Sequence, residues 1–252
     1  MRKFIKIFLL TLSSILIFIL LSWFTNQITQ HIITDVRIEN FKNSSVYQED
    51  LSSSTEKFYK VASNEECGYM EYGPYVYPGN KCDVIVSRKS AINIPFVADL
   101  VTFFAGGHAS LVLGDYNDYN ITADNTDVIE ATGLNEGLNL SEIHNRYYWS
   151  TGIGYDEVIV LRANNLTEEQ KDEVISNAIS HLDDPYNYSF TFDTVNKSYC
   201  SDLISKSFDP VGINLNKNGY WTTIYDLIVS SDCHIAYYHY YKDGVKYIYY
   251  VG

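Results

Sequence analysis

The sequence is short of basic residues. Of its 252 residues, 18 are lysine or arginine and 31 are aspartate or glutamate, which gives a formal net charge of −13. Three of the basic residues, Arg2, Lys3 and Lys6, lie in the first 24 positions, where there is no acidic residue. The rest of the chain therefore has 15 basic and 31 acidic residues and a net charge of −16. A domain this acidic is not expected to bind nucleic acid or an anionic membrane surface through a basic patch.

Cysteine is also scarce, and the common ligand-binding motifs are missing. The four cysteines, Cys67, Cys82, Cys200 and Cys233, have no C-x-x-C spacing, which argues against a zinc ribbon or a thioredoxin motif. The histidines form no H-x-x-x-H or H-x-H pair, and the sequence has no phosphate-binding loop or complete dinucleotide fingerprint. We therefore expect no metal site and no cofactor. Outside the cytoplasm, Cys67 and Cys82 are the closest candidates for a disulfide because they flank a short turn region.

One long apolar segment is present, at the N-terminus. Ile7 to Phe24 form an uncharged run that spans about 27 Å as a helix, close to the hydrocarbon thickness of a bilayer. Basic residues precede the run, and the next one is Arg37, so the positive-inside rule predicts a cytoplasmic N-terminus and an exported domain. Residues 22–26 have no A-x-A-like cleavage site, which favours an uncleaved signal anchor over a cleaved signal peptide. If the segment is cleaved, the protein is secreted.

The remaining sequence divides into two parts by composition. Residues 27–66 are polar and serine-containing, and we interpret them as a stalk with some helix. Residues 67–252 are expected to form one folded domain, since 46% of the chain is hydrophobic and 15% is aromatic. The 23 tyrosines favour a fold rich in strands. The predicted domains are thus an anchor (1–26), a stalk (27–66) and a catalytic domain (67–252).

Hydrophobic periodicity predicts an α+β fold with a largely antiparallel sheet packed on helices. A capping box at Thr167 to Gln170 begins one helix, and Lys242 to Gly244 form the turn of a C-terminal hairpin. The predicted strands are 83–87, 108–113, 127–132, 157–162, 234–241 and 245–251. The predicted helices are 93–104, 168–182, 198–208 and 223–229.

Three residues in these elements are candidates for chemistry. Cys200 lies at the start of a predicted helix, where free backbone N–H groups stabilise a thiolate and bind an oxyanion. His108 begins an apolar strand that holds it rigidly. Glu130 interrupts a strand otherwise fit for burial, and a buried carboxylate needs a partner such as a histidine. Taken one at a time, a buried cysteine, a strand-end histidine and an exposed edge carboxylate are equally ordinary interpretations.

Together these motifs resemble a known family. The order of GGHASLVLG around His108, DVIEATG around Glu130, DDPYNYSF at 183–190 and YCSDLI around Cys200 is similar to that of the permuted papain-like amidases of the YaeF/YiiX type. These belong to the NlpC-like superfamily, which also includes lecithin retinol acyltransferase-like enzymes. The resemblance covers roughly residues 78–235, and residues 223–227 resemble the segment that follows the catalytic helix.

The resemblance implies a circularly permuted papain-like fold and a role for each motif residue. Cys200 matches the nucleophile, His108 the base and Glu130 the residue that orients the base. Tyr199 matches a position that is usually tyrosine and is expected to line the acyl site. The sequence departs from the family at Lys81-Cys82-Asp83, where a glycine usually precedes the aspartate, and in a longer helical stretch before His108.

These expectations define a function and its alternatives. We predict a membrane-anchored, extracytoplasmic cysteine hydrolase that cleaves an amide through an acyl-enzyme, with cell-wall peptide or a lipid-linked acyl amide as the substrate. The alternatives are a thioesterase or acyltransferase that uses the same Cys200 and His108, and a binding module without catalysis.

Overall fold

A computed structural model provides the structure of the chain. It describes residues 2–65, 79–89, 96–114, 128–132, 141–144, 149, 155–190 and 195–252. Cys67 and the turn region that follows it lie outside them.

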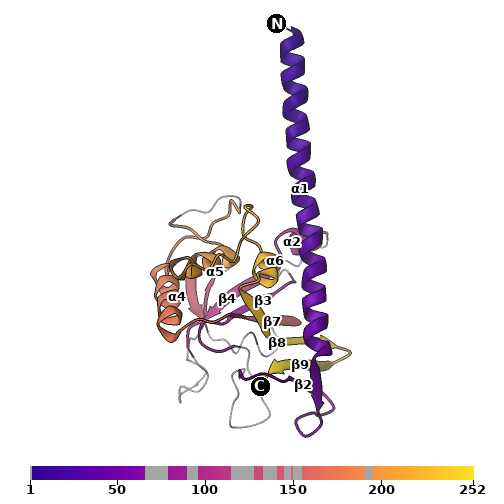
Figure 1. Ribbon diagram of the computed structural model, residues 1–252, viewed down its shortest axis with the longest axis vertical. Coiled ribbons are helices and arrows are strands. Elements are labelled where there is room, and N and C mark those ends of the chain that lie inside the picture. The colour runs from indigo at the N-terminus through magenta and orange to yellow at the C-terminus, as the bar shows by residue number, and fades with distance from the viewer. Residues whose placement is uncertain are drawn as a thin grey trace.

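Helix α1 (Arg2–Asn43) dominates the shape of the molecule. Its 42 residues extend about 63 Å, and its N-terminal half projects away from the domain (Figure 1). The large apolar side chains between Phe4 and Leu21 are exposed, so this segment is not the core helix of a soluble domain. By length and composition α1 is a candidate membrane span, and a signal sequence near an N-terminus meets the same criterion.

The second half of α1 packs on the domain. Gln27, Gln30, Thr34 and Ile38 are buried and form one stripe along the helix. The Arg37 guanidinium donates hydrogen bonds to the carbonyl oxygens of residues 228 and 230, at 2.6 and 2.7 Å, and to that of residue 233. These contacts fix α1 rigidly to the fold.

The segment expected to be a polar stalk is therefore part of the folded body. After α1, strands β1 (Ser45–Gln48) and β2 (Glu56–Val61) extend the sheet, and Phe58 is a buried core residue. Composition did not reveal this packing because the buried stripe of α1 is mostly polar. Its glutamines and threonine match no apolar pattern, although they lie against the domain.

The described residues form one nine-stranded sheet in the order β1-β2-β9-β8-β7-β3-β4-β5-β6. Neighbouring strands are antiparallel except β2 and β9, which are parallel. This confirms the expected α+β class with a largely antiparallel sheet. The other strands are β3 (Val84–Ser87), β4 (His108–Val112), β5 (Val128–Ala131), β6 (Ser141–His144), β7 (Glu157–Ala163), β8 (Cys233–Lys242) and β9 (Val245–Val251).

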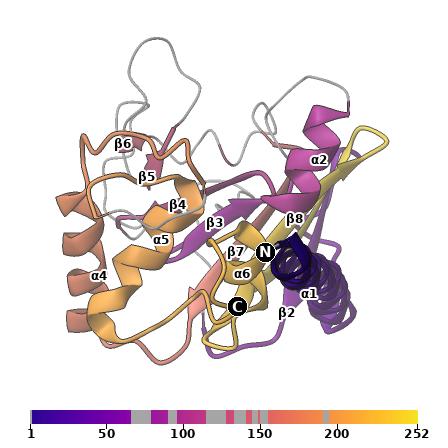
Figure 2. The same ribbon diagram turned by 90° about the horizontal axis from the view of Figure 1, so that it is seen from above.

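Helices cover one face of this sheet. They are α4 (Glu168–Ser180), α5 (Cys200–Phe208) and α6 (Ile224–Val229), and a 3-10 turn (Asp209–Val211) follows α5, while α2 (Val97–Phe104) lies beside α1 (Figure 1). Figures 1 and 2 show α4, α5 and α6 on the same side of the strands. The predicted capping box at Thr167 is present and begins α4.

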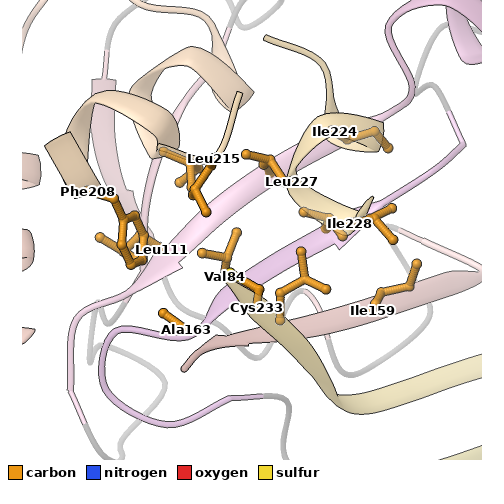
Figure 3. Close-up of a cluster of buried hydrophobic side chains, with 14 of the residues drawn as sticks. Val84, Leu111, Ile159, Ala163, Phe208, Leu215, Ile224, Leu227, Ile228 and Cys233 are labelled. Atoms are coloured by element: carbon orange, nitrogen blue, oxygen red, sulfur yellow. The ribbon is translucent and has the colours of Figure 1, made fainter. Parts of the chain in front are cut away.

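The main core lies between these helices and the sheet. Figure 3 shows Phe208 of α5 and Leu227 of α6 together with Val84 and Leu111 from the central strands. A second buried cluster lies on the opposite face of the sheet. It is formed by the strand side chains that point away from these helices, together with Trp149 and Tyr155. Burial on both faces explains why the central strands are almost continuously apolar.

The C-terminal hairpin accounts for part of the tyrosine excess. Asp243 and Gly244 have positive φ angles of 53° and 76° and form the two-residue turn between β8 and β9. The rings of Tyr240 and Tyr247 stack across the pair at 5.0 Å, and Tyr249 stacks on Tyr59 of β2 at 4.6 Å. Cross-strand packing of this kind stabilises a sheet.

Of the two candidates for a disulfide, Cys67 lies outside the described residues. Cys82 is a free, buried thiol next to the start of β3. Burial, followed by the charge of Asp83, raises the pKa of this thiol to about 12. Its side chain belongs to the main core, where it packs as a small apolar residue.

Candidate functional site

His108 is the first residue of β4, and two glycines determine its position. Gly106 has a φ of +82°, and a Cβ atom there would lie 2.0 Å from Cγ1 of Ile224. A Cβ atom on Gly107 would lie 2.2 Å from the carbonyl oxygen of Lys89 and 2.5 Å from that of Ser87. Just before His108 the chain passes between the end of β3 and the start of α6, and only glycine fits at positions 106 and 107.

Replacing Gly107 tests this placement. We expect Gly107→Ala to lower the free energy of unfolding by about 1–3 kcal/mol, because the new methyl group overlaps backbone oxygens that cannot move independently. Displacement of His108 should also slow alkylation of Cys200. Thermal unfolding and iodoacetamide labelling measure the two effects. Gly114→Ala is the control, since nothing lies within 4 Å of a Cβ atom at that position. Equal behaviour of the two variants would contradict the steric argument.

Cys200 is the first residue of α5, as the sequence predicted. Tyr199 precedes it in an extended conformation, with φ −102° and ψ 172°, and its side chain does not cap the helix. The first backbone N–H groups of α5 are therefore directed toward the space next to the thiol. Cys200 is a free cysteine and is 8% exposed. Helix α5 packs on β4 and β5, the strands that provide the other two candidate residues.

His108 lies between Glu130 and Cys200. Its Nε2 atom is 2.9 Å from Oε2 of Glu130, and the Cys200 thiol lies close enough to the imidazole to contribute to raising its pKa. Because Nε2 faces the carboxylate, Nδ1 is the nitrogen left for the thiol. Glu130 is 7% exposed, so its carboxylate has the partner that its burial requires. The structure thus brings together all three residues that the sequence singled out.

The surroundings of His108 favour its protonated form. Burial by itself lowers the pKa of the imidazole, but the charge of Glu130 and the hydrogen bonds to Cys200 and Glu130 outweigh it. The net result raises the pKa of His108 to about 10. At neutral pH the imidazole therefore carries a proton that it can donate to a leaving group.

This pKa links stability to pH. A histidine whose pKa is higher in the folded chain stabilises the fold fully below its unfolded value of about 6.5, and the contribution is lost as the pH rises through about 10. We expect the stability advantage of the wild type over His108→Gln to decrease across this interval. Urea unfolding of both proteins at about pH 6, 8 and 10 measures it. A constant difference would contradict the assignment.

Two aromatic residues hold the His108 ring, and the sequence did not identify them. Trp149 stacks on the imidazole at 5.7 Å with an interplanar angle of 3°, and Tyr155 stacks at 6.3 Å. Trp149 is 1% exposed, so the platform is rigid. The two residues follow His108 by 41 and 47 positions in the chain, and only a cluster of aromatic residues at 147–149 marks the region.

A group of aromatic rings lies beside Cys200 and includes its chain neighbour Tyr199. Tyr199, which the sequence predicted to line the acyl site, lies 5.5 Å from Phe190, and Phe190 lies 5.9 Å from Tyr186. Burial, followed by the charges of Cys200 and Tyr188, raises the pKa of Tyr186. Phe190 and Tyr188 remain 42% and 54% exposed. These four rings therefore form an apolar surface next to the thiol that is partly open to solvent.

Comparison with known proteins identifies a family for most of this domain. The model of the family "Permuted papain-like amidase enzyme, YaeF/YiiX, C92 family" matches residues 87–234, which include His108, Glu130 and Cys200. A similar solved structure is the crystal structure of metalloprotein YiiX from Escherichia coli O157:H7. It has a TM-score of 0.47 and 14% identity, and the match covers 64% of this chain and 97% of that one. No curated protein matches.

Proposed function

This chain belongs to the permuted papain-like amidase family, which makes it a cysteine-type hydrolase, and we propose that Cys200, His108 and Glu130 form its catalytic site. In this proposal Cys200 is the nucleophile, His108 transfers the proton and Glu130 orients His108. The observation that carries the proposal is the position of His108, which is 2.9 Å from the Glu130 carboxylate and close enough to Cys200, on the helix packed against its strand, for the thiol to contribute to raising its pKa. Such an arrangement activates a thiol and holds its base in place.

The proposed reaction is hydrolysis of an amide in two steps. His108 holds the proton of the Cys200 thiol, and the sulfur attacks the carbonyl carbon while the backbone N–H groups at the start of α5 stabilise the oxyanion. The C–N bond breaks as His108 gives this proton to the departing amine, which leaves a thioester on Cys200 and a neutral imidazole. His108 then accepts a proton from water, which attacks the thioester carbon. The C–S bond breaks, the acid is released, and the Cys200 sulfur leaves as a thiolate beside the protonated His108, as at the start.

We further propose that α1 anchors the site outside the cytoplasm. Arg2, Lys3 and Lys6 precede the apolar run, which places the N-terminus inside by the positive-inside rule. The helix continues without a break to residue 43, and its second half is clamped to the domain by Arg37. Cleavage just after the apolar run would cut the middle of this docked helix, which supports the anchor over a removed signal peptide.

One observation favours a second activity at the same site. The partly exposed rings next to Cys200, at positions 186, 188, 190 and 199, form an apolar surface suited to an acyl chain. A thioesterase or acyltransferase would use the same Cys200 and His108, with a different leaving group or acceptor. Parallel assays with an amide and a thioester that share one acyl group distinguish these activities.

Selective alkylation tests the proposed nucleophile. At pH 7 iodoacetamide should label Cys200 at least about 100-fold faster than Cys82 or Cys233, because burial raises the pKa of each of the latter thiols to about 12. Mass spectrometry of the cysteine-containing peptides gives each rate separately, including that of Cys67. The His108→Ala variant should lose the fast phase. Equal labelling of Cys200 and Cys233 would favour the non-catalytic binding module instead.

A further inference from the structure

Aromatic side chains of α1 contact those of α2 and of residue 221 where the apolar run of α1 ends. Trp23 stacks on Phe104 of α2 at 4.7 Å and contacts Trp221 at 4.9 Å. Phe24 contacts Phe103 at 5.8 Å. We refer to Trp23, Phe24, Phe103, Phe104 and Trp221 as the aromatic collar. Figure 1 shows α2 beside α1 near the point where the helix leaves the domain.

The collar occupies the position of a membrane boundary. Tryptophan and other aromatic residues concentrate at the ends of membrane spans, in the headgroup layer. Phe96 precedes α2, the helix that ends with Phe103 and Phe104, and is 71% exposed. Exposure of so large an apolar side chain is costly in water and favourable in that layer. The domain is strongly acidic, so aromatic rather than basic side chains are suited to contact the lipid.

The domain is held at this boundary by contacts along α1. His31 is within hydrogen-bond distance of the Phe103 carbonyl oxygen at 2.9 Å, and Gln30 donates a hydrogen bond to Asp226 of α6. Arg37 adds the three hydrogen bonds to backbone carbonyls described above. The catalytic domain therefore does not swing on a flexible tether, and its distance from the bilayer is set by the helix.

Both halves of the catalytic site connect directly to the collar. His108 follows Phe104 by four residues, which span at most about 14 Å. On the other side, Ser201 donates a hydrogen bond to the carbonyl oxygen of Thr222 at 3.0 Å. Ser201 adjoins Cys200, and Thr222 adjoins Trp221. The segments that contact α1 at the boundary are thus the same segments that position His108 and Cys200.

We propose that the collar and Phe96 lie in the lipid headgroup layer and that Cys200 acts on an amide carried by a membrane-resident amphiphile, not on a soluble peptide. The inference rests on the proposed catalytic role of Cys200. Because the contact is aromatic, it should not require anionic lipid. A substrate that diffuses laterally in the bilayer reaches a site held a short distance above it, which increases its effective concentration.

Spin-label depth measurements test the membrane contact. Full-length Phe96→Cys and Val46→Cys chains, each in a Cys67→Ser/Cys200→Ala background, are labelled with a nitroxide in phosphatidylcholine vesicles. Val46 is the matched control because it is 67% exposed and lies on β1, beyond the far end of α1. The label at 96 should be several-fold less accessible to an aqueous nickel complex. Asp99→Cys, also exposed on α2, provides a second probe if Phe96→Cys does not fold. Equal accessibility of the labels at positions 96 and 46 would overturn the inference.

Substrate presentation gives an independent test. The palmitoyl and acetyl amides of 7-amino-4-methylcoumarin are offered to the full-length wild type in phosphatidylcholine vesicles. We expect Cys200-dependent hydrolysis of the membrane-bound palmitoyl amide to be at least about 10-fold faster than that of the soluble acetyl amide. In Trp23→Ala/Trp221→Ala the ratio should fall toward one. Equal rates in the wild type would overturn the membrane inference and leave the proposed catalysis standing. Hydrolysis that persists in Cys200→Ala would contradict the proposed function itself.

Discussion

Cys200→Ala should abolish amide hydrolysis and leave the fold intact. Removal of a nucleophile that forms a covalent intermediate eliminates the whole pathway, so we expect a fall in turnover of about 10⁴-fold or more. The substitution removes one sulfur atom from a residue that is already nearly buried, and alanine is a good helix former at the start of α5. Hydrolysis of the palmitoyl amide by the vesicle-bound protein measures the loss.

Cys233→Ala is the matched control for this experiment. Cys233 is a buried, free cysteine like Cys200, but it lies in the core at the start of β8. Its thiol has a pKa raised to about 12 by burial, so it contributes no thiolate at neutral pH. Full activity in Cys233→Ala together with none in Cys200→Ala assigns the nucleophile. Residual turnover in Cys200→Ala would mean that another group carries the reaction.

Glu130→Gln should lower turnover by about 10²- to 10⁴-fold with little change in KM. Glutamine keeps the size of Glu130 and a hydrogen bond to His108, but it removes the charge that contributes most to raising the pKa of His108. The imidazole is then less readily protonated and is free to adopt the other tautomer, which misorients it toward the thiol. Glu130 thus acts as a positioning residue through His108.

The pH dependence distinguishes this role from a purely structural one. Loss of the Glu130 charge should shift the alkaline limb of the pH–rate profile to lower pH, because His108 loses its proton earlier. A residue that only stabilised the fold would lower the melting temperature and leave the profile unchanged. Asp172→Asn on α4 is the control for a carboxylate-to-amide change, since its side chain is 70% exposed and pairs with Lys81. An unmoved profile in Glu130→Gln would rule out the proposed orienting role.

The sequence predicted most elements that hold the candidate site. The strands that hold His108 and Glu130 and the helix that begins at Cys200 lie within a few residues of their predicted bounds. Their signals are local: a glycine pair before β4, a charged residue within an apolar strand, and a helical spacing of Leu203, Ile204 and Phe208. Patterns of this kind depend on neighbours in the chain, so sequence alone is enough to recognise them.

Other features could not be predicted because they depend on distant partners. Trp149 stacks on His108 from 41 positions away, and nothing in its local sequence identifies that contact. The stripe of α1 that faces the domain is polar, so composition suggested an exposed stalk where the structure has a packed helix. The packing of this stripe depends on Asp226, which accepts a hydrogen bond from Gln30 and lies 196 residues after it in the chain.

By itself, the sequence determined that the chain has a long apolar helix, an acidic α+β domain, and a cysteine, a histidine and a glutamate in the order of one enzyme family. Only the tertiary structure decided that α1 is clamped to the domain by Arg37, and that Phe104 and Trp221 connect its Trp23 to the site. The physical reason is that helix and strand periodicity is a local property of the chain. The hydrogen bonds and ring contacts that place the site relative to α1 form only after the sheet has brought distant segments together.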